Sequence, residues 1–223
     1  MDIRDIILII CGLINFLFCI LLFSRSRTNK TNQLFGFVLL LTMFWIFSML
    51  FFRISTTESA INFFALLPFL FGLLIAVPLL LFSYAFPFKL EEQPRILKVI
   101  VWVGLIIVVA LLYLPGFILS SSHYVGGSTV QTASARYIIY IAYFTILGAA
   151  SLVELYKKYQ KSAGSNRFQV RWVLVGIAFA LLAGSIFDIL LPFNGNYYYN
   201  WLGPVSSVLM NLIIAKMIFV KSE

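Results

Sequence analysis

The chain has 223 residues, of which 62% are hydrophobic and 11% are charged. Soluble domains carry about 25% charged residues, so a chain this apolar cannot hide its surface in one water-soluble core. The formal net charge of +8 would suggest nucleic acid in a soluble protein, but Lys and Arg also gather in the cytoplasmic loops of membrane proteins. We therefore expect an integral membrane protein in a lipid bilayer, with no nucleic-acid partner.

Seven apolar segments follow one another, each near the ~20 residues that cross the ~30 Å hydrocarbon core of a bilayer as a helix. We expect spans at about residues 6–23, 34–52, 61–86, 97–114, 137–156, 170–191 and 204–220. Pro68 and Pro78 lie inside the third and longest span, where proline predicts a kink. The expected fold class is an all-α integral membrane protein, a seven-transmembrane helix bundle that forms a single domain over residues 1–223.

The connections between the spans are polar and differ in charge. Residues 25–32 and 157–169 are basic. The longest connection, residues 117–136, is rich in Ser, Gly and Thr and holds the only histidine, His123. The last connection, residues 193–203, reads FNGNYYYNWLG. The helical spans are therefore separated by segments whose charges can be used to orient the chain in the membrane.

The distribution of Lys and Arg predicts that orientation. If the N-terminus lies outside, 13 of the 16 Lys and Arg residues fall on the cytoplasmic side. Only Arg4, Arg53 and Arg136 remain outside. Because cytoplasmic loops carry an excess of basic residues, we expect a multi-pass protein of the cell (plasma) membrane with its N-terminus outside and its C-terminus in the cytoplasm.

Polar side chains inside the spans are the first candidates for function. Asp188 lies in the outer part of the sixth span, where it either caps loop backbone or lines a cavity open to the outside. Asn15 and Asn211 either join helices by hydrogen bonds or contact a ligand. Glu154 and Lys216 lie near the cytoplasmic ends of their spans, where an interfacial position explains both.

Two groups of residues are therefore predicted to bind other molecules. The aromatic connection before the seventh span either forms an interfacial belt or the rim of an outer cavity for a small ligand of unknown identity. The candidate ligand pocket consists of Asp188, Asn194, Tyr197, Trp201 and Asn211. The candidate contact surface for a cytoplasmic partner consists of Lys157, Lys158, Lys161, Arg167 and Arg171.

No combination of residues predicts catalysis. Cys11 and Cys19 lie on one helix and cannot pair with each other. The sequence has no HExxH motif, no P-loop and no paired carboxylates within one span. We expect a protein that is not an enzyme and that has neither a cofactor nor a metal site.

Several short motifs, in order along the chain, resemble the N-terminal seven-transmembrane region of bacterial histidine kinases. They are Asn32 with Trp45, Phe82-Ser83-Tyr84-Ala85-Phe86-Pro87, Asn166-Arg167-Phe168-Gln169, Leu190-Leu191-Pro192 with Phe193-Asn194-Gly195, and Leu202-Gly203-Pro204. No single motif is specific, but their order and spacing cover nearly the whole sequence. The resemblance implies a sensory or signal-input module.

The same resemblance also implies a dimerisation helix and a kinase or another output domain after the seventh span. The sequence ends at Glu223, without a phospho-accepting histidine or an ATP-binding lid, so kinase activity is not implied for this chain. We expect either a stand-alone member or a region whose output domain lies elsewhere. The predicted function is the transmission of an extracellular or intramembrane signal to a cytoplasmic kinase or other output protein. A small-solute transporter, a non-catalytic subunit of a larger complex and a homodimer remain open.

Overall fold

The computed structural model of the chain describes residues 2–25, 29–89, 92–125, 128–194 and 198–219. In chain order its elements are α1 (Ile3–Arg25), α2 (Lys30–Ile54), α3 (Glu58–Ala85), α4 (Arg95–Leu112), β1 (Leu119–Val125), β2 (Ser128–Ala133), α5 (Tyr137–Lys161), α6 (Gly164–Gly184), the π-helical η1 (Ser185–Leu190), α7 (Leu191–Phe193) and α8 (Leu202–Phe219).

Seven helices within these described ranges are long and apolar enough to cross a membrane. The sixth consists of α6, η1 and α7 in direct succession, from Gly164 to Phe193. In hydrocarbon each backbone N–H and C=O needs a partner inside the protein, and a helix supplies these partners within one segment. The predicted seven-transmembrane helix bundle is therefore confirmed.

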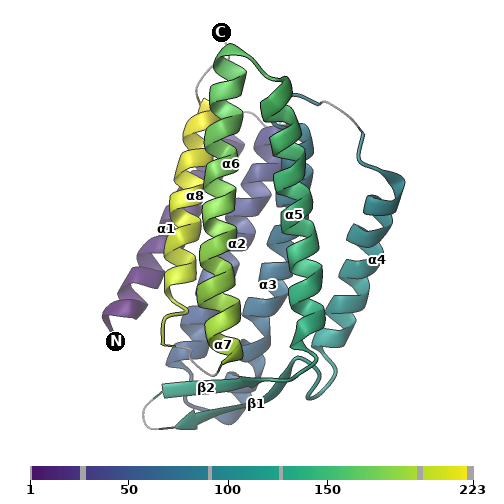
Figure 1. The fold of residues 1–223 in the computed structure, drawn as a ribbon. Helices are drawn as coiled ribbons and strands as arrows, with labels where there is room; N and C mark the ends of the chain where they lie inside the picture. Colours follow the sequence, from purple (N-terminus) through teal and green to yellow (C-terminus); the bar gives the residue numbers. More distant parts are fainter. Residues whose placement is uncertain (1, 26–28, 90–91, 126–127, 195–197, 220–223) are drawn as a thin grey trace.

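Successive helices run in opposite directions and give the bundle two distinct ends (Figure 1). One end holds the start of α1, the β1–β2 hairpin and the connection from α7 to α8, and we call it the hairpin end. The other, which we call the C-terminal end, holds the α5–α6 turn and the end of α8. Gly164 has φ +53°, a backbone conformation that glycine adopts without strain, and lets α5 and α6 join through only Ser162 and Ala163.

The buried core has two main parts along the bundle. Toward the C-terminal end, Leu22, Phe35 and Phe82 belong to a cluster that joins α1, α2, α3, α5, α6 and α8. Toward the hairpin end, Leu73 and Tyr140 belong to a second cluster of α3, α4, α5, η1 and the segment before β1. α4 lies at the margin of the bundle (Figure 1) and leaves large apolar side chains uncovered, as expected for a helix that faces lipid.

The longest connection contains structure that the sequence reading did not predict. β1 and β2 pair as an antiparallel hairpin, with Ser121 opposite Thr132, and the hairpin lies across the hairpin end (Figure 1). The Ser122 hydroxyl donates to Asn62 Oδ1 of α3 at 2.6 Å, and Ile118, just before β1, is buried. Two runs rich in Ser, Thr and Val around a Gly-Gly pair are a hairpin signal in the sequence, which the reading of this segment as a plain connection overlooked.

A pair of buried amides joins the first and last spans. Asn211 Nδ2 of α8 donates to Asn15 Oδ1 of α1 at 2.6 Å, and Asn15 Nδ2 donates to the Cys11 carbonyl at 2.8 Å. Both side chains are almost completely buried. Of the two roles considered for these amides, the structure therefore shows the hydrogen bond between helices, which favours close packing of α1 against α8.

We expect this amide pair to stabilise the bundle measurably. In a double-mutant cycle of Asn15→Ala and Asn211→Ala, the coupling energy should be about 0.6 kcal/mol and at most about 1.7 kcal/mol, the range found for hydrogen bonds between membrane helices. The measurement is the free energy of unfolding in mixed micelles. Asn15→Ala combined with Ser83→Ala is the control, because Ser83 bonds within α3 and the two changes should be additive. Equal coupling in both cycles would contradict the direct amide contact.

Candidate functional site

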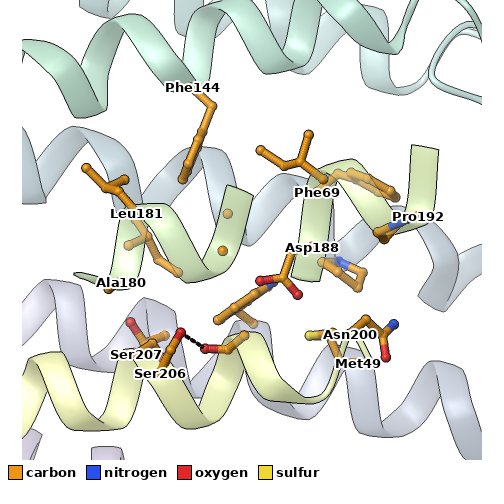
Figure 2. A pocket seen from close by; sticks show the side chains of 18 of the residues that line it. Met49, Phe69, Phe144, Ala180, Leu181, Asp188, Pro192, Asn200, Ser206 and Ser207 are labelled. Carbon is orange, nitrogen blue, oxygen red and sulfur yellow. Dashed lines mark hydrogen bonds between the residues drawn. The ribbon is translucent and has the colours of Figure 1, made fainter. Parts of the chain in front are cut away.

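A cavity of about 130 Å³ lies in the hairpin half of the bundle, between α2, α3, α5, α6–η1 and α8 (Figure 2). Its aromatic lining consists of Trp45, Phe69, Tyr137, Tyr140 and Phe144, and its polar lining of Thr42, Asp188, Asn200, Ser206 and Ser207. An engineered protein cavity of about 150 Å³ holds benzene, so this space suits a ligand with about one ring. It is the candidate functional site because it combines an apolar wall with a few polar groups.

Asp188 reaches this cavity from the π-helical segment η1. Pro192 follows four residues later and has no N–H to donate to the Asp188 carbonyl, so the regular helical hydrogen bond cannot form there. The Tyr137 hydroxyl of α5 donates to that carbonyl instead, at 3.4 Å. π-helical turns inside longer helices occur frequently at functional sites. The regular α-helix is thus interrupted at Asp188, the one acidic side chain among the described residues that line the cavity.

The carboxylate of Asp188 is buried without compensation. The residue as a whole is half-buried, but both carboxylate oxygens are inaccessible to solvent and have no hydrogen-bond partner among the described residues. No Lys or Arg from the described part of the chain lines the cavity. Because an ionised carboxylate without partners costs several kcal/mol in an apolar medium, this carboxylate does not stabilise the unliganded bundle.

The first turn of α8 lies directly against this carboxylate. A Cβ atom at Gly203 would overlap the Asp188 side chain, so only glycine leaves room for it. Figure 2 shows Asp188 pointing from η1 toward α8. The N-terminus of a helix carries a partial positive charge equivalent to about half an elementary charge, which favours the ionised carboxylate without neutralising it fully.

The other polar groups of the cavity mostly offer hydrogen-bond acceptors. The hydroxyls of Thr42, Ser206 and Ser207 donate their protons to carbonyls of their own helices at 2.6–2.8 Å, which leaves their oxygens free to accept. Oδ1 of Asn200 is buried and has no partner among the described residues. Together with Asp188, these oxygens favour a ligand that donates protons or carries positive charge.

The structure places the predicted pocket residues in different environments. Asp188 lines the cavity, and Asn211 instead pairs with Asn15. The Asn194 amide is exposed and donates to the Leu190 carbonyl at 2.8 Å. Trp201 is partly buried and packs against the cluster of α1, α2 and α8 that includes Leu8 and Val208. Tyr197 lies outside the described residues. Of the predicted pocket residues that the structure describes, Asp188 alone therefore contributes to this cavity.

Sequence reasoning missed the aromatic wall and Asn200. Tyr137, Tyr140 and Phe144 recur every three or four residues on α5, a spacing that places them on one helix face. Phe69 of α3 packs edge to face against Tyr137 and Tyr140, with ring centroids 5.5 Å apart in both pairs. The periodicity could have identified the α5 face, but nothing in the sequence pairs that face with Phe69.

Four of the five basic residues predicted to contact a partner are exposed at the C-terminal end: Lys157, Lys161, Arg167 and Arg171. Lys158 is the exception, because it is fully buried and its Nζ donates to the Tyr84 and Phe86 carbonyls at 2.7 and 2.9 Å. These carbonyls close the last turn of α3, where a helix has no donors of its own. The prediction that Lys158 belongs to the contact surface is therefore wrong. Its side chain instead joins α5 to the end of α3 by hydrogen bonds.

Comparison with known proteins gives one family. A family model described as the N-terminal 7TM region of histidine kinase matches residues 7–221 of the chain. No curated protein matches. The matched region includes every residue of the Asp188 cavity, so the site belongs to the part of the chain that the family describes.

Close packing between Asp188 and Gly203 makes a specific prediction. Gly203→Ala should destabilise the protein by about 1–3 kcal/mol, the usual cost of overpacking, because the new methyl group overlaps the carboxylate. Asp188→Ala in the same chain should restore most of that loss by removing the overlapping atoms. The measurement is the free energy of unfolding of both single variants and the double variant. Two independent, additive effects would show that these groups are not in contact.

Proposed function

The chain belongs to the family of N-terminal seven-transmembrane regions of histidine kinases, and we propose that it is a sensory input module whose ligand binds in the Asp188 cavity. The observation that carries this proposal is the uncompensated carboxylate at the wall of a cavity inside the bundle. A polar group without partners stabilises nothing in the unliganded protein, but it contributes binding free energy when a complementary ligand arrives.

The proposed orientation in the plasma membrane places this cavity in the outer half of the bilayer. Apart from Asp188 in the cavity, the described charged side chains at the hairpin end are three basic and three acidic ones, a net charge of zero. Arg53 pairs with Asp5 at 2.9 Å and Arg4 with Asp2 at 2.6 Å, so two of the three basic residues there are neutralised. The C-terminal end holds the other described basic residues, which supports its assignment to the cytoplasm.

Occupancy of the cavity can be relayed through the helices that line it. A ligand shifts a conformational equilibrium only if it binds two helix arrangements with different affinity. The cavity lies between η1 and the first turn of α8, so a ligand beside Asp188 bears directly on the position of α8 relative to α6. α8 runs from this site to the C-terminal end, where Lys157, Lys161 and Arg167 form an exposed basic surface for a cytoplasmic output protein.

The orientation can be tested with cysteine labelling in intact cells. Ser120→Cys, exposed in strand β1 of the hairpin, should react with a membrane-impermeant maleimide before the cells are permeabilised. Lys161→Cys, exposed at the C-terminal end, should react only afterwards. The parent chain is the control, since Cys11 and Cys19 are buried and should label in neither condition. The reverse pattern would place the cavity in the inner half of the bilayer and overturn the proposed orientation.

The binding site can be tested by filling the cavity. A Cβ at Gly184 would meet only Asp188 Oδ2, at 3.6 Å, so Gly184→Leu should occupy the space beside the carboxylate without forcing the helices apart. Compounds that stabilise the purified protein, by about 2.7 kcal/mol at 100 times their Kd, should lose that effect in this variant. Leu182→Phe is the matched control, because Leu182 is 64% exposed on the outside of the same helix. Stabilisation that persists in Gly184→Leu would move the ligand site elsewhere.

The same compounds should change the distance between spin labels at Lys157→Cys and Lys216→Cys, which lie on α5 and α8 near the C-terminal end. An unchanged distance with a bound compound would contradict a relay to the cytoplasm. Flux of the compound across proteoliposomes distinguishes a sensor from a transporter, because a sensor should transport none of it.

A further inference from the structure

The charge balance around the cavity favours a cation. Asp188 supplies two buried carboxylate oxygens without partners, and none of the described Lys, Arg or His side chains lines the cavity to neutralise them. The α8 N-terminus compensates only part of this charge. A ligand that carries one positive charge would complete the site, whereas an anion would add repulsion to the carboxylate.

Aromatic rings form the wall on the side of α3 and α5. Tyr137 and Tyr140 stack with centroids 5.3 Å apart, and Phe69 meets both edge to face at 84° and 87°. Tyr137 and Tyr140 also stack with Phe193 and Phe144, so their faces are covered by other rings, and this wall serves to bury the apolar part of a ligand. A bare metal ion would leave this apolar wall without contacts, and the described residues contain no group of three or more His, Cys, Asp or Glu side chains that could hold one.

The hairpin end does not oppose the approach of such a ligand. Apart from Asp188 itself, its described side chains have no net charge, and the guanidinium groups of Arg4 and Arg53 are paired with Asp2 and Asp5. This end therefore has no net positive charge that would repel a cation.

We propose that the ligand class of this cavity is a small organic cation, an amine with about one ring, whose ammonium group pairs with Asp188 and whose apolar part packs against Phe69, Tyr137 and Tyr140. This inference rests on the proposed function of the cavity as a ligand site and specifies its chemistry. The ammonium donates hydrogen bonds to the Asp188 carboxylate, whose two oxygens have no partner among the described residues.

The test compares three one-ring probes of similar size on the full chain in lipid nanodiscs, by isothermal titration calorimetry. Benzylamine is a cation at neutral pH, benzyl alcohol is neutral and benzoate is an anion. Benzylamine should bind at least tenfold more tightly than benzyl alcohol, and benzoate should not bind. Gly184→Leu should remove the specific binding of benzylamine and benzyl alcohol, and the heat that remains measures partition of each probe into lipid.

Two matched variants test whether the Asp188 carboxylate causes the preference for benzylamine over benzyl alcohol. Asp188→Asn, which keeps the size of the side chain, should weaken benzylamine at least tenfold and leave benzyl alcohol unchanged. Glu58→Gln removes an exposed carboxylate at the same end of the bundle and should leave the preference intact. If Asp188→Asn does not fold, the three probes on the unaltered chain still decide the question.

Three results would overturn the inference. In the first, benzylamine does not bind at 10 times the concentration at which benzyl alcohol saturates the site. In the second, benzyl alcohol or benzoate binds as tightly as benzylamine. In the third, Asp188→Asn leaves benzylamine binding unchanged. Competition by sodium ions that abolishes benzylamine binding at equal concentration would assign the site to an inorganic cation and overturn it too. In each case the proposed function survives if another compound binds in a manner sensitive to Gly184→Leu, and fails if none does.

Discussion

The hydrocarbon core of a membrane contains no water that could hydrogen-bond to polar groups, so these groups need partners inside the protein. This constraint shapes the bundle throughout. The seven spans meet it for their backbones by being helical. Lys158 meets it at the end of α3 by donating to the Tyr84 and Phe86 carbonyls. Asn15 and Asn211 meet it in the middle of the bundle by bonding to each other. Each of these contacts fastens one helix to another, so the need for hydrogen-bond partners also organises the packing.

Asp188 departs furthest from this constraint, because it is the one described residue with two buried side-chain oxygens that lack a hydrogen-bond partner. Pro192, four residues after Asp188, has no N–H to donate to the Asp188 backbone carbonyl. The helix is π-helical at this point, and the Tyr137 hydroxyl donates to that carbonyl instead. By contrast, no described residue donates a hydrogen bond to the Asp188 carboxylate. The same short segment therefore contains a carefully satisfied backbone and an unsatisfied side chain. Buried polar groups that serve packing are normally paired. The missing partners of the Asp188 carboxylate therefore indicate a binding role more clearly than its burial alone.

The two ends of the bundle differ in a way that suits signalling. The hairpin end is nearly neutral, carries the hairpin and contains the cavity, while the C-terminal end is strongly basic. α8 connects them, with its first turn beside Asp188 and its last residues among the basic side chains. Such a helix can transfer a small displacement over the length of the bundle because a helix is stiff and packed side chains resist compression.

Sequence alone determined the class of protein, the seven spans and the uneven distribution of charge, because hydropathy over ~20 residues and the position of Lys and Arg act through the solvent rather than through specific contacts. It also identified Asp188, since a lone carboxylate in an apolar span is unusual wherever it points. Tertiary structure decided which residues surround that carboxylate. Gly203, Asn200 and Phe69 are distant from Asp188 or unremarkable in the sequence, and only helix packing brings them together. Packing also decided that Lys158 turns inward while Lys157 beside it stays exposed, because consecutive residues of a helix point about 100° apart and the neighbouring α3 lies on one side only.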